Sequence, residues 1–269
     1  MTDQPQARQQ ASQQASQQAS QQASKLTSAP ESPAAPTPKA RSNPVHRAIR
    51  SFIRREGRLT GAQARAISEQ LPAVELAGQG ALLDLSQVFG RVAPCTLEIG
   101  FGNGESLLAM AAAAPEHDFI GIEVHRPGVG QLVLGIERLG LTNIRIVAED
   151  AVPFLQQRIK DNSLDRLLLY FPDPWHKARH HKRRIVQTPF ADLIARKLNP
   201  TGLWHCATDW APYAEHMRAV LDAHPAFVAA HAGSGEAARP AWRPETKFER
   251  RGIRLNHAVF DLLYRRRAP

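Results

Sequence analysis

Two hydrophobic patterns alternate along the chain from about residue 95 onward. Short runs rich in Val, Ile and Leu, typical of buried strands, are each followed by a segment with apolar residues three or four apart, typical of amphipathic helices. The expected strands are Thr96–Phe101, Phe119–Val124, Ile144–Ala148, Leu164–Phe171, Leu203–Ala207, Ala226–Ala230 and Leu255–Tyr264, and the expected helices are Ser106–Ala114, Val129–Leu139, Val152–Lys160, Phe190–Lys197 and Tyr213–Leu221. This alternation predicts an α/β fold with a doubly wound, mostly parallel seven-stranded sheet (Rossmann-like), closed by an antiparallel last strand.

The first 90 residues follow other patterns. Residues 1–43 are rich in Gln, Ser, Ala and Pro and repeat Gln-Gln-Ala-Ser four times between Gln9 and Ser24. Such a segment buries too little apolar surface to offset its ordering entropy, so we expect a disordered tail. Between Val45 and Leu71 the apolar spacing predicts short amphipathic helices on either side of Gly57. We therefore expect a tail at 1–43, a helical extension at 44–90 and an α/β domain at 91–269.

Positive charge is concentrated in two segments. The formal net charge is +9, and the pI is near 10.1. Residues 176–184 contain five Lys or Arg and no acid, and residues 239–267 contain nine Lys or Arg against three acids. The rest of the chain is close to neutral. A single basic run is often only a solvated face, but two of them favour a polyanionic partner such as nucleic acid.

The two cysteines, Cys95 and Cys206, have neither C-x-x-C nor mixed Cys/His ligand spacing, which is typical of a reducing cytosol. The chain contains no apolar run of about 18 residues and no secretory signal pattern. We therefore expect a soluble, cytoplasmic monomer with no membrane partner. His176, His180 and His181 suggest a metal site, but no acid or Cys nearby completes one, so no metal is expected.

Glycines recur at every second position where the first expected strand ends. The sequence there is Glu98-Ile-Gly100-Phe-Gly102-Asn-Gly104. Glycine lets the backbone approach a ligand closely and opens the following helix tightly. A dinucleotide fingerprint G-x-G-x-x-G needs a further glycine at position 105, which is Glu105 here. The turn is therefore a candidate cofactor site, and its acids disfavour a pyrophosphate.

Two more acids follow at expected strand ends. Glu123 ends the second strand about 20 residues after the glycines, where a carboxylate can accept hydrogen bonds from both hydroxyls of a ribose. Asp150, next to Ala151, ends the third strand. Acids at three adjacent strand ends repel phosphate but attract a ligand with a cationic amino group and a sulfonium. These residues favour S-adenosyl-L-methionine over a phosphate-bearing cofactor.

The fourth expected strand runs into Phe-Pro-Asp173-Pro-Trp-His-Lys. Asp173 lies between two prolines at the strand end, and ligands of open α/β sheets bind beyond the carboxyl ends of the strands. The basic segment 176–184 follows directly. We therefore expect the ligand site and the polyanion-binding surface to meet near Asp173.

These motifs together resemble the bacterial tRNA (guanine-N7-)-methyltransferases. The matching elements, in the same order from roughly Leu97 to Arg266, are Glu98-x-Gly-x-Gly-x-Gly, Gly-Ile-Glu123-Val-His, Asp150-Ala, Phe-Pro-Asp173-Pro-Trp-His-Lys177, Ala-Thr-Asp209-Trp and Thr246-Lys-Phe-Glu-Arg-Arg-Gly252. The resemblance implies a class I methyltransferase fold. It also implies methylation of N7 of a guanine in the variable loop of tRNA.

The resemblance also implies roles for single residues. Asp173 corresponds to the family's proposed catalytic residue. Cofactor contacts are implied for Glu98, Glu123, Asp150 and Asp173, with Gly100, Gly102, Gly104 and Ala151 beside them. Substrate contacts are implied for Lys177, Asp209, Thr246, Lys247, Phe248 and Glu249.

The chemistry leaves three alternatives. Guanine N7 already carries a lone pair, so its methylation needs positioning and charge stabilisation rather than a general base. Methylation of an exocyclic amine of another RNA is typical of Asp-Pro-Pro-Tyr/Phe at this strand end, and Asp173-Pro-Trp-His lacks the second proline. A small-molecule methyltransferase has no need of two basic segments. A non-catalytic RNA-binding module has no need of three acids in register.

Overall fold

The structure is a computed structural model that describes residues 51–52, 57–76, 78–230, 237–246, 249–250 and 258–268. The expected disordered tail at 1–43 lies outside these residues.

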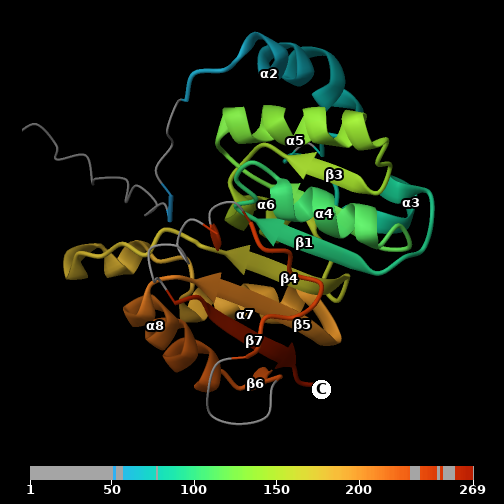
Figure 1. Ribbon diagram of the computed structural model, residues 1–269. Coiled ribbons are helices and arrows are strands. Elements are labelled where there is room, and N and C mark those ends of the chain that lie inside the picture. The colour runs from blue at the N-terminus through green and yellow to red at the C-terminus, as the bar shows by residue number, and fades with distance from the viewer. Residues whose placement is uncertain are drawn as a thin grey trace, which may run out of the picture. The chain divides into compact units, whose positions relative to one another are not determined.

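A seven-stranded sheet with the order β3-β2-β1-β4-β5-β7-β6 forms the centre of the α/β domain (Figure 1). The strands are β1 Cys95–Ile99, β2 Asp118–Ile122, β3 Ile144–Val147, β4 Leu164–Tyr170, β5 Leu198–Thr208, β6 Phe227–Ala229 and β7 Phe260–Arg266. The pairings among β1 to β5 are parallel, whereas β7 pairs antiparallel with both β5 and β6. The predicted mostly parallel sheet with an antiparallel last strand is confirmed. The strand order reverses between β1 and β4, which is where such folds bind ligands.

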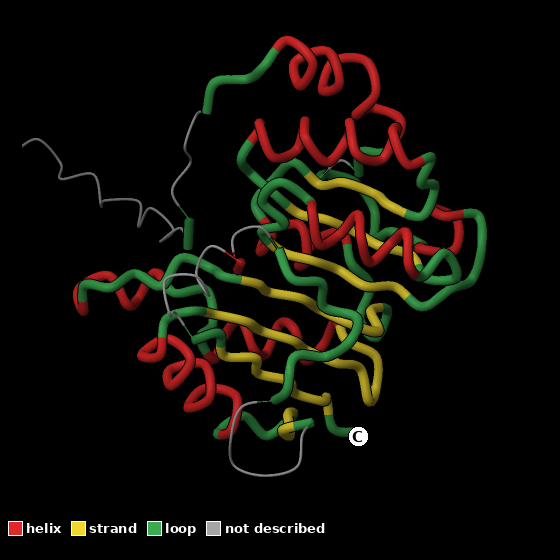
Figure 2. The backbone as a smooth tube through the Cα atoms, in the orientation of Figure 1, coloured by secondary structure: helices red, strands yellow, loops and turns green. Residues whose placement is uncertain are grey.

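Helices cover both faces of this sheet (Figures 1 and 2). They are α2 Gly61–Arg65, α3 Leu85–Phe89, α4 Glu105–Ala113, α5 Arg126–Leu139, α6 Ala151–Arg158, α7 Thr188–Lys197 and α8 Ala211–Asp222, with the short helices η1 Ala66–Gln70, η2 Leu71–Ala73 and η3 Ala178–Arg183. Leu107 of α4 and Leu132 of α5 belong to one buried cluster. Phe154 of α6, Ile194 of α7 and Met217 of α8 belong to the other. Two cores, one on each face, are typical of a doubly wound sheet.

Helices α5, α7 and α8 begin two or three residues earlier than their apolar spacing predicts. Each has a proline, Pro127, Pro189 or Pro212, in its first two positions. Proline fits the first turn because the N–H that it lacks has no partner within the helix. The predicted starts, set by the apolar spacing, fall after these prolines, whereas each proline is the second residue of its helix.

Residues 61–73 and 85–89 form short helical pieces. The helix expected before Gly57 falls largely on residues 45–50 and 53–56, outside the described residues. Thr60 and Gln63 cap α2 reciprocally, because the Thr60 side chain accepts a hydrogen bond from Gln63 N (3.2 Å) and the Gln63 side chain accepts one from Thr60 N (3.0 Å). Gln63 lies so close to Gly130 of α5 that a side chain at that position would collide with it. Helix α3 was not predicted, since five residues are too short to show a helical period.

Candidate active site

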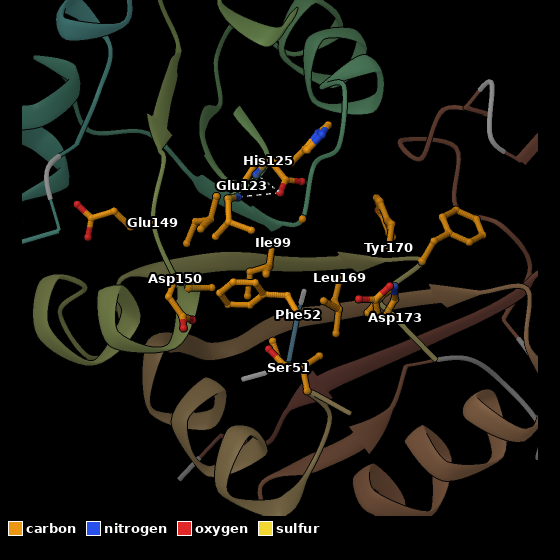
Figure 3. A pocket seen from close by; sticks show the side chains of 17 residues that line it. Ser51, Phe52, Ile99, Glu123, His125, Glu149, Asp150, Leu169, Tyr170 and Asp173 are labelled. Carbon is orange, nitrogen blue, oxygen red and sulfur yellow. Dashed lines mark hydrogen bonds between the residues drawn. The ribbon is translucent and has the colours of Figure 1, made fainter. Parts of the chain in front are cut away.

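A cavity of about 380 Å³ opens where β1, β2, β3 and β4 end (Figure 3). Its wall combines apolar strand ends with carboxylates. The lining residues are Ser51, Phe52, Ile99, Gly100, Ile122, Glu123, Val124, His125, Glu149, Asp150, Ala151, Leu169, Tyr170, Phe171, Pro172, Asp173 and Ile185. Of the expected cofactor-binding residues, Gly100, Glu123, Asp150, Ala151 and Asp173 gather here. Their contact with a cofactor stays a prediction.

The glycine turn between β1 and α4 forms the wall of the cavity next to β1. Gly100 has a φ of +74°, and a side chain there would project into open space. Gly104, with a φ of +76°, is the N-cap of α4. Gly128 of α5 leaves no room for a side chain, because the carbonyl oxygen of Gly102 lies directly against it. Only Gly100 of the three predicted glycines lines the cavity, whereas Gly102 and Gly104 shape the turn.

Glu123 connects the end of β2 to the glycine turn. One carboxylate oxygen accepts a hydrogen bond from Gly102 N at 2.9 Å. The other accepts from Val124 N at 2.7 Å and from His125 N at 2.9 Å (Figure 3). Three backbone N–H donors of this kind fix the position of the carboxylate. The carboxylate is therefore held in one orientation at the cavity wall.

Glu98 lies in the middle of the fold rather than on the cavity wall. It is only 2% exposed, and both carboxylate oxygens accept from the Ser106 hydroxyl, at 2.8 and 3.1 Å. Burial raises the pKa of Glu98 from 4.5 to about 7; the Ser106 hydrogen bond opposes this shift and the nearby Glu123 charge adds to it. Its predicted cofactor contact is not tested by this position. A bound cation near Glu98 would favour its ionised form.

The raised pKa of Glu98 makes folding stability depend on pH. Between pH 4.5 and 7 the folded protein keeps a proton that the unfolded chain releases, so stability falls as the pH rises and the loss is complete above pH 7. Relative to Glu98→Gln, the free energy of unfolding of the parent should fall by about 3 kcal/mol across this interval. Urea unfolding of both proteins at several pH values measures this difference. If the difference in unfolding free energy between the two proteins did not change with pH, the raised pKa of Glu98 would be contradicted.

Asp150 and Asp173 occupy the ends of β3 and β4. Asp150 is the N-cap of α6 and accepts from Val152 N at 3.2 Å. Asp173 is exposed at the cavity mouth. The nearby Phe171 and Trp175 both have a φ of +49°, which bulky residues rarely adopt. Such strain persists only where surrounding contacts impose it, and it clusters at active sites.

The contacts that hold this conformation come from β5, from Ser51 and from the arginines that follow the loop. Phe171 N donates to Ala207 O of β5 at 2.7 Å, and Trp175 Nε1 donates to Ser51 O at 3.0 Å. Arg183 lies over the Trp175 ring at 3.9 Å. Arg184, only 4% exposed, donates from Nε to Pro174 O at 2.9 Å. These contacts together hold the loop that carries Asp173 in place.

The basic segment 176–184 divides into exposed and structural cations. Lys177, Arg179 and Lys182 are exposed on or next to η3. Arg183 and Arg184 hold the Asp173 loop instead. The charge count of this segment therefore overstates the number of cations available to a polyanion.

The expected substrate-binding residues are more widely placed. Asp209 follows the end of β5 and is half-buried. Thr246 accepts from Glu249 N at 3.2 Å through its hydroxyl. Lys247 and Phe248 lie outside the described residues. Of the described residues in this set, neither Asp209, Thr246, Glu249 nor Lys177 lines the cavity. Their substrate contacts stay predictions.

A buried polar chain was missed in the sequence. The Tyr170 hydroxyl and His205 Nδ1 are 3.0 Å apart, and His205 Nε2 and Asp261 Oδ1 are 2.7 Å apart. Arg243 donates to Asp261 at 2.8 Å and to both oxygens of Glu249 at 2.6 and 2.8 Å. This chain connects Glu249 to Tyr170 of the cavity wall. The available signal was His205 and Asp261, each a single polar residue in an otherwise hydrophobic stretch, 203–207 and 260–264.

None of the helices in the described part of the chain combines the length and the hydrophobicity of a membrane-spanning segment. The same part of the chain contains no group of three or more His, Cys, Asp or Glu side chains placed to hold a metal ion.

The fold and the site define a class. A sheet of this order, with an antiparallel β7 and carboxylates around one cavity at the strand ends, is that of a class I methyltransferase. The fold is similar to the crystal structure of the 16S rRNA methyltransferase KamB, with a TM-score of 0.50 and 14% identity over 72% of this chain and 99% of that chain. Residues 92–262 match the family model described as a putative methyltransferase.

Two relatives narrow the family. The tRNA (guanine-N(7)-)-methyltransferase of Pseudomonas putida (strain ATCC 47054) is 54% identical over 89% of this chain and 98% of its own length. That of Alcanivorax borkumensis is 55% identical over 83% of this chain and 94% of its own. The chain belongs to the tRNA (guanine-N(7)-)-methyltransferase family.

Proposed function

We propose that this protein transfers the methyl group of S-adenosyl-L-methionine to N7 of a guanine in the variable loop of tRNA. Family membership supports the reaction and the substrate class. The observation that carries the proposal in the structure is Asp173, exposed at the mouth of a carboxylate-lined cavity and directly followed by the basic segment. In this proposal the cofactor site and the polyanion-binding surface meet at Asp173.

The cavity fits this cofactor. Gly100 presents backbone and open space, and Ile99, Ile122 and Leu169 provide apolar contact area. Glu123 and Asp150 supply carboxylates for the ribose hydroxyls and polar groups, while the negative charge favours a cationic ligand over a phosphate. When bound, the cofactor supplies an electrophilic methyl group on a sulfonium. Glu98, Glu123, Asp150 and Asp173 are the residues proposed to hold it.

Asp173 then acts on the base. Because N7 already carries a lone pair, no residue has to remove a proton, and the main requirement is alignment of N7 with the methyl group. Alkylation leaves the purine cationic, so a carboxylate nearby stabilises the charge that develops. The constrained loop around Asp173 fixes its backbone before substrate arrives. Asp173 is thus proposed to align the base and to stabilise the developing charge, and it is not required to act as a general base.

A direct assay separates this function from its alternatives. The protein is incubated with bulk tRNA and labelled S-adenosyl-L-methionine, and the digested nucleosides are identified by mass spectrometry. We expect label in 7-methylguanosine. Label in a base methylated on an exocyclic amine, or cofactor binding without transfer to RNA, would refute the proposal.

The exposed cations next to Asp173 should contact tRNA phosphates. We expect the double variant Arg179→Ala, Lys182→Ala to bind tRNA more weakly and with a flatter salt dependence, by roughly 0.7–0.9 of a log unit per lost phosphate contact. Its rate at saturating tRNA should equal that of the parent. Binding measured at several salt concentrations gives the slope.

A matched control removes two exposed arginines elsewhere, Arg138→Ala and Arg196→Ala. They lie in the last turns of α5 and α7, whereas the cavity residues His125 and Ile185 lie just before the first turns of these helices. This control should keep the parent's salt slope. Equal slopes for both double variants would show that η3 is not the RNA-binding surface.

A further inference from the structure

Trp210 is exposed, in contrast to the other three tryptophans. It is 39% exposed, whereas Trp204 is fully buried. Arg183 lies over the Trp175 ring at 3.9 Å, and Arg166 lies over the Trp242 ring at 4.4 Å. An aromatic ring left partly in water forgoes a large hydrophobic gain, so an exposed tryptophan at a ligand site is a candidate contact.

The backbone of Trp210 is firmly held. Its N–H donates to the Thr208 hydroxyl at 3.3 Å, and its carbonyl oxygen accepts from Tyr213 N at 2.9 Å and Ala214 N at 3.1 Å as α8 begins. The His176 ring packs against the Trp210 ring, with centroids 4.4 Å apart and planes at 86°. Edge-to-face packing of this kind restricts the orientation of the ring.

Trp210 also lies level with Asp173. Strands β4 and β5 are neighbours, and Tyr170 pairs with Ala207 in their parallel register. Asp173 and Trp210 each follow this pair by three residues, so both emerge from the same edge of the sheet on adjacent strands. His176, which touches Trp210, is three residues from Asp173. The exposed cations of η3 begin at Lys177, directly beyond His176.

A constrained aromatic ring beside a cationic surface is the combination by which proteins hold unstacked bases. We propose that Trp210, supported by His176, is the stacking surface for the guanine that receives the methyl group. The inference rests on the proposed function, since it assigns a residue to the recognition of that substrate. The phosphates on either side of the base would face the η3 cations, and the base would lie between Trp210 and the cavity mouth.

The reaction gives this stack a catalytic effect. The N7 lone pair forms the new N–CH₃ bond while the C–S bond breaks with its electrons passing to sulfur, so the positive charge moves from the sulfonium to the purine. A cation is attracted to the face of an indole more strongly than a neutral ring is. The stack therefore strengthens as charge develops, and interactions that strengthen in the transition state raise kcat rather than only lowering KM.

The test compares Trp210→Leu and Trp210→Phe with the parent in 7-methylguanosine formation on tRNA. We expect Trp210→Leu to lower the rate at saturating tRNA roughly ten- to a hundredfold, and Trp210→Phe to lose less because it keeps an aromatic face. Fluorescence titration gives a readout independent of turnover. The parent should bind 7-methylguanosine monophosphate more tightly than guanosine monophosphate, and Trp210→Leu should narrow that preference.

Leu139→Ala is the matched control, because Leu139 is a 47% exposed apolar residue at the C-terminal end of α5. It should retain the parent rate, and thermal melting of all variants should agree. A Trp210→Leu rate at saturating tRNA within twofold of the parent, or an unchanged nucleotide preference, would overturn the inference while leaving the proposed function standing. A parent that forms no 7-methylguanosine would overturn both.

Discussion

Replacing Asp173 by Ala should lower the rate of methyl transfer at saturating tRNA and cofactor by roughly two to four orders of magnitude, as the loss of a positioned electrostatic group does. The carboxylate is exposed at the cavity mouth, where the proposed function places the incoming base and the charge that forms on it. The loop around it is held by Arg184 and by backbone contacts that the Asp173→Ala variant would keep, so the structure should survive. Single-turnover rates under saturating conditions isolate the chemical step.

Asp173→Asn separates the two contributions of this residue. It keeps the size and a hydrogen-bond acceptor but removes the charge, so a rate close to that of Asp173→Ala assigns the effect to charge and a rate close to the parent assigns it to positioning. Affinity for tRNA should hold in both variants because Arg179 and Lys182 remain. An Asp173→Ala variant nearly as fast as the parent would remove Asp173 from the mechanism.

Replacing Glu123 by Ala should weaken cofactor binding by on the order of 2–4 kcal/mol, the loss expected for charge-assisted hydrogen bonds. Two effects add here. The variant loses the proposed acceptor for the ribose hydroxyls, and it also loses the carboxylate that holds Gly102, Val124 and His125 in place. Calorimetric titration with S-adenosyl-L-methionine measures the change, and tRNA affinity should change far less.

Glu149→Ala provides the control for Glu123→Ala. Glu149 also lines the cavity, but its carboxylate accepts from Gly78 N at 3.0 Å. Figure 3 shows its side chain apart from that of Glu123. Its removal should weaken cofactor binding much less. Equal losses for Glu123→Ala and Glu149→Ala would mean that cavity charge alone matters, and equal losses of cofactor and tRNA affinity in Glu123→Ala would point to misfolding.

The order of strands and helices could be predicted because each element carries its own periodicity. The predicted starts of α5, α7 and α8 are late because the apolar spacing begins only after their first residues. Pro127, Pro189 and Pro212 are favoured in the first turn of a helix and belong to it. Helices α3 and η3 escaped because short segments carry too few apolar positions to show a period.

The candidate site was predictable to the extent that it depends on strand ends. Glu123, Asp150 and Asp173 gather at one cavity because parallel strands place their carboxyl ends along one edge. The burial of each carboxylate was not predictable. Glu98 comes near the end of its strand, like Glu123, yet it is buried behind the cavity wall. The run of like charges at 176–184 does not reveal that Arg184 is buried and donates to Pro174 O. The sequence also does not show that Arg243 pairs with Asp261, 18 residues further along the chain.

Mapping the methylated position tests directly whether the protein methylates N7 of a guanine in the variable loop of tRNA. A purified tRNA is treated with the protein and S-adenosyl-L-methionine, and the strand is then cleaved chemically at 7-methylguanosine and sequenced. The proposed function predicts a single new cleavage in the variable loop. This cleavage should be absent when the Asp173→Ala variant replaces the parent at the same reaction time. Cleavage elsewhere, or none although labelled methyl groups enter the RNA, would contradict it.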